Sequence, residues 1–310
     1  MTPAIQTSQL HKRYGRRTAV HALDLTVEPG TVFGLIGPNG AGKTTTLRML
    51  LDIIRPSGGV ARVLGSDPRR GGPALRRRIG FVPGDLRLEG RVTGRRLLDF
   101  YAQVSGPVAP GARDELAERL GLDLTRPVRT LSKGNKQKLG LVQAFMHKPE
   151  LLVLDEPTSG LDPLVQREFL EMVRQARAAG QTVLLSSHVL SEIQQTADAV
   201  AVLSAGRIVA HGNVASLRLA AVRRLSVGLV DADPGILDVE LRPLGQLSDL
   251  HVAAHPGGSV RVTATIEGDI DPVIKALARH RVSDLTVEEP DLEESVLRLY
   301  GASEEEGGRA

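Results

Sequence analysis

The stretch "GLIGPNGAGKTTT", residues Gly34–Thr46, passes from an apolar strand pattern through a glycine-rich loop into a helix pattern. It matches G-x-x-x-x-G-K-[ST] through Gly37, Gly42, Lys43 and Thr44. The glycines allow successive backbone N–H groups to point at phosphate oxygens, and the helix that follows adds the positive end of its dipole. The stretch therefore predicts a site for nucleotide phosphates at a strand-to-helix junction.

Individual side chains of this loop have distinct expected roles. Lys43 would reach the β- and γ-phosphates, and the Thr44 hydroxyl would ligate a magnesium ion. We expect the neighbouring positions Asn39, Gly40 and Thr45 to contact the nucleotide as well. The alternative, a glycine-rich turn with an incidental lysine, does not account for the strand before the loop and the helix after it.

A second stretch, "LLVLDEP" (Leu151–Pro157), is an apolar run that ends in two carboxylates. This is the form of a buried strand that delivers acids at its C-terminal edge. Asp155 would hold the magnesium ion, directly or through water, and Glu156 would orient and polarise the attacking water. A chance Asp-Glu pair after a strand is common, so this interpretation depends on the phosphate loop in the same chain.

Up to about residue 212, short β-branched runs alternate with longer amphipathic segments, as in a wound α/β sheet. Helices are expected to begin near Lys43, Thr93, Asp114, Ser132, Pro163 and Leu190, and strands to cover about residues 5–10, 20–27, 31–37, 59–65, 78–83, 151–157, 182–188, 199–206 and 207–212. The run from about 84 to 150 has helix patterns without a convincing strand, so we expect a helical insert there.

Four further motifs accompany the phosphate loop and the acidic pair. "LSKGNKQ" (residues 131–137) is similar to the signature L-S-G-G-Q, and "SGLD" (residues 159–162) follows the acidic pair. His188 stands in "SSHVL", and Tyr14 stands in "KRYG". Together, in this order, the six elements make the chain resemble the nucleotide-binding subunit of ABC transporters across about residues 5–212.

The resemblance implies an α/β P-loop NTPase with a RecA-like core, an antiparallel β subdomain and a helical subdomain. It implies that ATP and Mg²⁺ are bound, that His188 contacts the γ-phosphate and that Tyr14 stacks on adenine. Two copies would pair head to tail, so that signature residues of one copy close over ATP held by the other; these residues are Ser132, Gly134, Asn135 and Asp162. A separate multi-span permease is implied as a second partner.

Several of these residues also have simpler interpretations. His188 could be an ordinary residue at the end of a strand, and Tyr14 a surface residue. Asp162 precedes Pro163 and could serve as a helix N-cap, alone or in addition to its role at the interface. Ser132 could cap its own helix, although that would not explain the glycine and asparagine that follow.

The chain departs from the family pattern at two positions. Lys133 replaces the first glycine of the signature, and Asn135 and Lys136 precede its glutamine, a form typical of the antibiotic and multidrug export branch, which includes daunorubicin-resistance ATPases. The second departure is "GFVPGDLRLEG", where Gly84 stands in place of the Q-loop glutamine or glutamate. Because glycine offers no side-chain ligand, metal coordination at this position would have to come from water or Asp85, and neither Gly84 nor Asp85 is included among the predicted metal ligands.

The C-terminal part differs from the rest in charge and pattern. Residues 235–310 contain fifteen acidic and seven basic residues, which leaves residues 1–234 with a net charge of +11. Short alternating segments separated by helix patterns at about 235–245, 270–280 and 291–300 predict a small α+β, ferredoxin-like domain. We therefore expect an ABC ATPase domain over 1–215 with a helical subdomain at about 84–150, an accessory domain over 216–301, and a disordered tail over 302–310. "EPDLEESVLRLYG" resembles the end of this branch's accessory domains.

Composition limits the alternative functions. The sequence contains no cysteine, no signal-peptide pattern and no stretch of eighteen apolar residues. Nine arginines in residues 69–96 would suit a permease loop, anionic headgroups or nucleic acid. A soluble ABC ATPase acting on ribosomes or DNA is the main alternative, and a non-hydrolysing sensor is a second one. The single cassette without cysteines argues against the first, and Glu156 against the second. We expect a peripheral subunit at the cytoplasmic face of the membrane, with no nucleic-acid partner.

Overall fold

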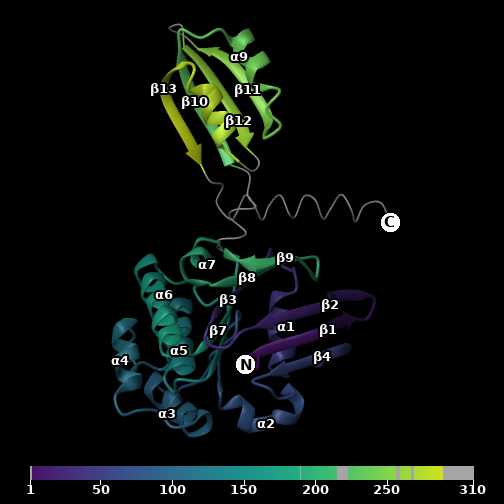
Figure 1. Cartoon of the computed structure of the whole chain (residues 1–310). Coiled ribbons are helices and arrows are strands. Elements are labelled where there is room, and N and C mark those ends of the chain that lie inside the picture. Colours follow the sequence, from purple (N-terminus) through teal and green to yellow (C-terminus); the bar gives the residue numbers. More distant parts are fainter. Residues whose placement is uncertain (1, 189, 215–222, 256–258, 267–268, 289–310) are drawn as a thin grey trace. The chain divides into compact units, whose positions relative to one another are not determined.

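The computed structural model describes residues 2–188, 190–214, 223–255, 259–266 and 269–288. The chain folds as two compact units, Met1–Val214 and Ala215–Ala310 (Figure 1). The tail predicted over 302–310, the helix expected at about 291–300 and the "EPDLEESVLRLYG" segment after Glu288 lie outside the described residues.

A six-stranded sheet forms the centre of the first unit. Its order is β5-β6-β7-β3-β8-β9, and β5 to β8 run parallel while β9 is antiparallel to β8. The strands are β3 (Val32–Ile36), β5 (Ile79–Val82), β6 (Leu151–Asp155), β7 (Thr182–Ser187), β8 (Ala199–Ser204) and β9 (Arg207–Asn213). Every residue of β3, β6 and β7 is buried, which explains why these strands read as continuous apolar runs rather than alternating ones.

A three-stranded antiparallel sheet, in the order β2-β1-β4, packs with the first helix. Its strands are β1 (Ile5–Tyr14), β2 (Arg17–Val27) and β4 (Gly58–Val63). Helix α1 (Lys43–Leu50) places Leu47, Met49 and Leu50 in a core shared with both sheets. This shared core fixes the direction in which α1 leaves the phosphate loop.

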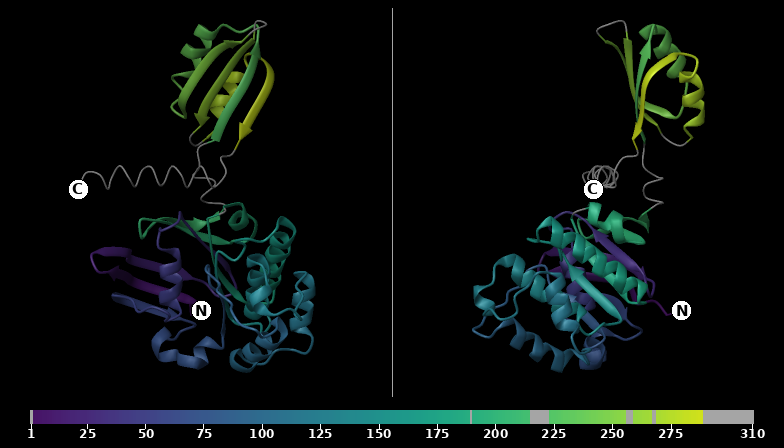
Figure 2. Two further views of the ribbon diagram at one scale, coloured as in Figure 1. Left: turned by 180° about the vertical axis from the view of Figure 1, so that it is seen from behind. Right: turned by 90° about the vertical axis from the view of Figure 1, so that its left-hand side faces the viewer.

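The remaining helices of the first unit, all except α2, gather on the side of the six-stranded sheet away from β1, β2 and β4 (Figures 1 and 2). The remaining helices are α2 (Pro68–Arg76), α3 (Gly94–Ser105), α4 (Ala112–Arg119), α5 (Lys133–Phe145), α6 (Pro163–Ala178) and α7 (Leu190–Thr196). In the described parts of the chain, no helix has both the length and the apolar character needed to cross a membrane.

Helix α2 was not expected from the sequence. Asp67 caps it by accepting hydrogen bonds from the N–H groups of Arg69 and Arg70, and Pro68 occupies its first turn. Gly72, with φ of 54°, kinks it in the middle. Two glycines and a second proline within nine residues indicate a loop, so the sequence did not predict this helix, which its cap stabilises.

The described residues of the second unit form a four-stranded antiparallel sheet with α9 and α10 on one face (Figure 2). Its elements are β10 (Arg223–Val230), α9 (Pro234–Leu241), β11 (Leu247–His255), β12 (Ser259–Ile266), α10 (Asp271–Leu277) and β13 (Arg281–Glu288). The spatial order β11-β12-β10-β13 and the succession βαββαβ are those of the predicted ferredoxin-like arrangement. Inward residues such as Val227, Val262 and Leu237 form its core.

Candidate functional site

The phosphate loop connects β3 to α1 in the backbone geometry that its glycines permit. Gly42 is the N-cap of α1, has a φ of 109° and provides no side-chain cap. A β-carbon at this position would lie 2.8 Å from the carbonyl oxygen of Ala19. A β-carbon on Gly37 would lie 2.4 Å from the Leu203 carbonyl oxygen. Both positions therefore require glycine, and the first N–H groups of α1 are not occupied by a capping side chain.

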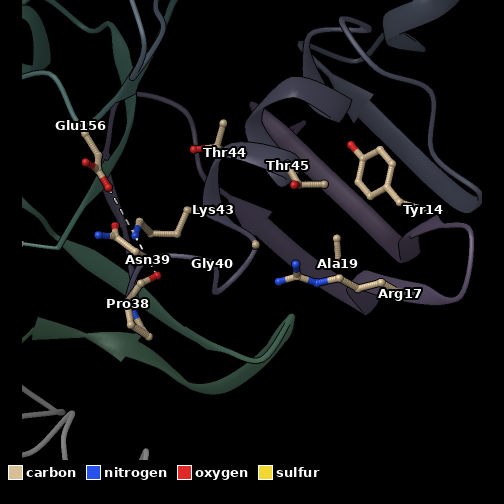
Figure 3. Close-up of a pocket in the computed structure, with 11 residues that line it drawn as sticks. Tyr14, Arg17, Ala19, Pro38, Asn39, Gly40, Lys43, Thr44, Thr45 and Glu156 are labelled. Atoms are coloured by element: carbon tan, nitrogen blue, oxygen red, sulfur yellow. Dashed lines mark hydrogen bonds and ion pairs between the residues drawn. The ribbon is translucent and has the colours of Figure 1, made fainter.

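A cavity of about 410 Å³ opens beside this loop (Figure 3). It brings together residues from β1, β2, the phosphate loop, the start of α1 and the turn after β6. The lining residues are Tyr14, Arg17, Ala19, Pro38, Asn39, Gly40, Gly42, Lys43, Thr44, Thr45 and Glu156. Most of the residues predicted for the nucleotide site thus surround one cavity, although they come from segments more than 140 positions apart in the sequence.

Lys43, Glu156 and His188 form a chain of charged and polar contacts. The Lys43 ammonium is buried, donates to the carbonyl oxygen of Gly37 at 2.5 Å and lies 3.5 Å from Oε1 of Glu156. Nδ1 of His188 lies 3.3 Å from Oε2 of the same carboxylate. The Glu156 carboxylate therefore stands between the phosphate-loop lysine and the histidine, at the carboxyl edge of the parallel strands.

Asp155 is buried at the end of β6 and is held by the neighbouring strand. Its Oδ1 accepts a hydrogen bond of 2.6 Å from the Ser186 hydroxyl on β7. Among the contacts of the described residues, Oδ2 accepts no hydrogen bond. Carboxylate and hydroxyl oxygens are ligands that Mg²⁺ prefers, and the Thr44 hydroxyl points toward the Glu156 side of the cavity (Figure 3). The donor set thus fits a magnesium ion held by Asp155 and Thr44.

Gly84, which stands at the Q-loop position, lies directly against Asp155. A β-carbon on Gly84 would be 3.1 Å from Oδ2 of Asp155 and 3.3 Å from its Cγ. Asp85, the next residue, pairs instead with Arg87 at 2.9 Å and is exposed. A residue with a side chain at position 84 would therefore crowd the Asp155 carboxylate, whereas glycine does not.

The signature segment lies at the start of α5 and is bonded within its own chain. The Ser132 hydroxyl accepts a hydrogen bond from the N–H of Asn135, as an N-cap does. A β-carbon on Gly134 would lie 2.7 Å from the carbonyl oxygen of Gly160, so this helix end packs closely on the "SGLD" turn. Asp162 caps α6 by accepting from Val165 at 3.0 Å. None of these signature residues lines the cavity in the described part of the chain.

Five residues at the site were missed by the sequence analysis, and one of them, Pro38, lies within the phosphate loop itself. Arg17 and Ala19 line the cavity because Gly15, with a φ of 57°, turns β1 back into β2. The buried Gln137 amide donates to the carbonyl oxygen of Pro157 at 2.9 Å, which ties α5 to the turn after the acidic pair. Ser186 contacts Asp155. The "YGRR" sequence offered a hairpin pattern for Arg17, whereas Gln137 and Ser186 carried no local pattern.

Comparisons with known proteins agree with this geometry. The family model described as "ABC transporter" matches residues 20–159. The chain is 36% identical to the daunorubicin/doxorubicin resistance ATP-binding protein of Streptomyces peucetius, with 95% of this chain and 98% of that protein covered. It is 33% identical to the bacitracin transport ATP-binding protein of Bacillus licheniformis, with 97% and 98% covered.

A solved structure shows the same likeness in three dimensions. The ATP-binding subunit of an ABC transporter is 29% identical and superposes with a TM-score of 0.65, covering 70% of this chain and 92% of that one. Because the sequence relatives match over almost the whole length, the likeness includes the second unit as well as the nucleotide-binding unit. The phosphate loop, the acidic pair and these likenesses lead to one conclusion: the chain belongs to the ABC transporter family, as an ATP-binding protein with ATPase activity.

Proposed function

We propose that this ABC ATPase powers the export of a drug, an antibiotic or a lipid-like compound through a separate membrane permease. The observation that carries the proposal is the match, over 95% of the chain, to a protein named for daunorubicin and doxorubicin resistance. The bacitracin transport protein matches over a similar length. The alternative, an ATPase acting on ribosomes or DNA, is not favoured, because these relatives are named for drug resistance and antibiotic transport.

In this proposal, ATP occupies the cavity beside the phosphate loop. Tyr14, which is half exposed at the end of β1, stacks on the adenine ring, and Asn39, Gly40 and Thr45 contact the phosphates and ribose. Lys43 exchanges its contact with the Gly37 carbonyl for one with the β- and γ-phosphates. The N–H groups of the uncapped α1 end provide further donors for the phosphate charge.

Hydrolysis depends on the residues that lie at the carboxyl edge of β6 and β7. Glu156 orients the attacking water and accepts its proton, and His188, in contact with Glu156, aligns that water against the γ-phosphate. Thr44 and Asp155 hold the magnesium ion, which neutralises phosphate charge when bound. Lys43, because its ammonium is buried and fixed, stabilises the charge that develops on the transferred phosphoryl group.

The signature residues complete the site in a second copy of the chain. Ser132 and Asn135 stand at a helix N-terminus, where N–H groups and the helix dipole favour an anion. They do not line the cavity of their own chain, so the phosphate they meet is one held by a partner copy in a head-to-tail dimer. Gly134 and Asp162 shape the surface that this partner meets.

The permease partner accounts for the location of the protein and for the transport step. The subunit is held at the cytoplasmic face of the membrane by a multi-span protein, and ATP-driven closing and opening of the dimer moves that protein. The arginine-rich segment over 69–96 precedes and overlaps the Q-loop position and supplies positive charge toward the permease or anionic headgroups. Nucleic acid is not part of this assembly.

The decisive experiment combines a trapped dimer with partner capture. In the Glu156→Gln variant, ATP should bind without being hydrolysed, and the apparent mass on a sizing column should double when ATP and Mg²⁺ are added. Membrane purification of the tagged wild-type chain should recover a hydrophobic partner with several spans. A variant that stays monomeric with ATP, or a wild-type chain that is recovered with ribosomes or DNA instead, would contradict the proposal.

A further inference from the structure

The strand β7 ends in two adjacent serines whose side chains point to different partners. Ser186 is fully buried, and its hydroxyl donates to Oδ1 of Asp155 at 2.6 Å. The Ser187 hydroxyl donates to the buried Glu192 at the start of α7. Because side chains alternate along a strand, only Ser186 faces the acidic pair on β6.

Ser186 also holds the backbone of Glu156. The Glu156 N–H donates both to the Ser186 hydroxyl and to the Ser186 carbonyl oxygen, each at 3.1 Å. Glu156 has a φ of 46°, in the left-handed region that non-glycine residues rarely occupy. Such a conformation persists where its surroundings over-determine it, and these two hydrogen bonds are a local cause. One hydroxyl therefore bridges the aspartate side chain and the glutamate main chain.

The Oδ2 side of the Asp155 carboxylate faces Gly84. A β-carbon added to Gly84 would lie 3.1 Å from Oδ2, closer than ordinary van der Waals contact, so the missing side chain leaves this oxygen uncrowded. The Ser186 hydroxyl engages Oδ1, whereas Oδ2 accepts no hydrogen bond among the described residues. Ser186 therefore holds one oxygen of the carboxylate and leaves the other for a metal ion.

We infer that Ser186 is a positioning residue, which orients Asp155 toward the magnesium ion and fixes the backbone from which Glu156 reaches the water. This inference rests on the proposed function and adds a residue to it. Removing a residue that hydrogen-bonds to a metal ligand typically lowers metal affinity or activity by about 10- to 100-fold. Ser186 is not among the residues that line the cavity, and its hydroxyl contacts Asp155 and Glu156, so its effect is expected to pass through the acidic pair.

The test compares three variants by metal binding as well as by turnover. Ser186→Ala removes the hydroxyl, and Ser186→Thr retains it on a β-branched side chain that suits a strand. Thr182→Val is the matched control, since Thr182 lies at the other end of β7, is buried and accepts a hydrogen bond from the Gly30 N–H at 2.9 Å. Thermal unfolding of all three establishes that each variant is folded.

The primary readout is Mn²⁺ binding, followed by electron paramagnetic resonance in the presence of a non-hydrolysable ATP analogue. We expect Ser186→Ala to weaken Mn²⁺ binding about tenfold and to lower kcat more than it raises the KM for ATP. Binding of ATP in the presence of EDTA should stay unchanged, Ser186→Thr should restore most of the metal affinity, and Thr182→Val should leave Mn²⁺ binding at the wild-type level.

The possible outcomes separate the inference from the proposed function. Wild-type Mn²⁺ affinity and kcat in a folded Ser186→Ala variant would overturn the positioning role while leaving the ATPase assignment intact. An equal loss of Mn²⁺ affinity in Thr182→Val would also overturn it, because the effect would then belong to the strand as a whole. Absence of ATP hydrolysis by the wild-type chain together with its permease would instead overturn the proposed function.

Discussion

Helices α1 and α5 both begin at a lysine, Lys43 and Lys133, yet their N-termini are used differently. At α1 the cap is Gly42, which makes no side-chain hydrogen bond, and a cavity of about 410 Å³ faces the first turn. At α5 the cap is Ser132, whose hydroxyl accepts from the Asn135 N–H. The first helix end is therefore open toward a ligand of its own chain, whereas the second is partly satisfied before any ligand arrives.

A polar helix start therefore does not by itself identify a binding site. The phosphate-loop end is surrounded by β1, β2 and the turn after β6, which together enclose a volume. The signature end is instead packed on the "SGLD" turn through Gly134 and tied to Pro157 through Gln137. An anion bound at α5 must therefore be delivered from outside the chain, as the dimer proposal requires.

The largest expected difference concerns the first lysine of each helix. Lys43→Ala removes a buried ammonium that faces the phosphate site, so ATP turnover should fall about 100-fold or more in a phosphate-release assay. Lys133→Ala is the matched control, because Lys133 is also the first residue of its helix but is exposed. Comparable losses in both variants would show that the two helix ends are not functionally distinct.

Glycine substitutions offer a second contrast. Gly42→Ala forces a left-handed backbone onto alanine, at a cost of about 1–2 kcal/mol, and brings its β-carbon to 2.8 Å from a carbonyl oxygen. We expect lower stability and weaker binding of a fluorescent ATP analogue. Gly134→Ala should leave monomer nucleotide binding intact and slow hydrolysis, because it pushes α5 away from Gly160. Equal nucleotide affinity in both variants would contradict the comparison.

The cap of α5 predicts a smaller effect with two separable parts. Ser132→Ala should lower the free energy of unfolding by about 1 kcal/mol through loss of the cap, and should slow hydrolysis without weakening ATP binding to the monomer. Asp67→Ala removes the comparable cap of α2 and should cost similar stability with normal turnover. Denaturant titration of both variants measures the loss of stability, and ATPase assays measure the loss of turnover. Full turnover in the Ser132→Ala variant would show that Ser132 acts only as a helix cap.

The smallest expected effect comes from the far end of α5. His147 follows this helix, and burial lowers the pKa of its imidazole below the usual value of 6.5. The unfolded chain then takes up the proton first, so the free energy of unfolding should fall as the pH drops below about 6.5. His147→Gln should flatten this slope. His21, near the phosphate loop, also has its pKa lowered, by burial and by Arg207, so it contributes to the same slope, and His21→Gln measures that second contribution separately.

If His147→Gln leaves the pH slope unchanged and His21→Gln removes it, then His21, and not His147, causes the loss of stability at low pH. Denaturant titrations at pH 5.5 and 7.5 on the wild-type chain and both variants separate the two cases. Because the ATP site contains neither histidine, turnover at neutral pH should be the same in all three proteins.

Much of the first unit could be predicted because its signals are local. Buried parallel strands such as β6 appear as apolar runs, and the starts of α1, α6 and α7 were expected at the residues where they begin. Helix α2 was missed because its glycines and proline contradict helix propensity, and only its cap and packing compensate for them. In the second unit, period-two alternation indicated the strands, and pairing of β10 with both β12 and β13 followed from the fold class.

The same distinction between local patterns and long-range contacts applies to the site. The residues that can meet phosphate are readable in the sequence, because a glycine loop before a lysine and a threonine is chemically specific over a few positions. Their surroundings depend on the folded chain: Arg17 reaches the cavity through a hairpin, Ser186 on β7 contacts Asp155 on β6, and Gly84 stands beside the same carboxylate. Such contacts join positions that are far apart in the chain, and the physical reason they escape sequence patterns is that strand pairing, not spacing, brings them together.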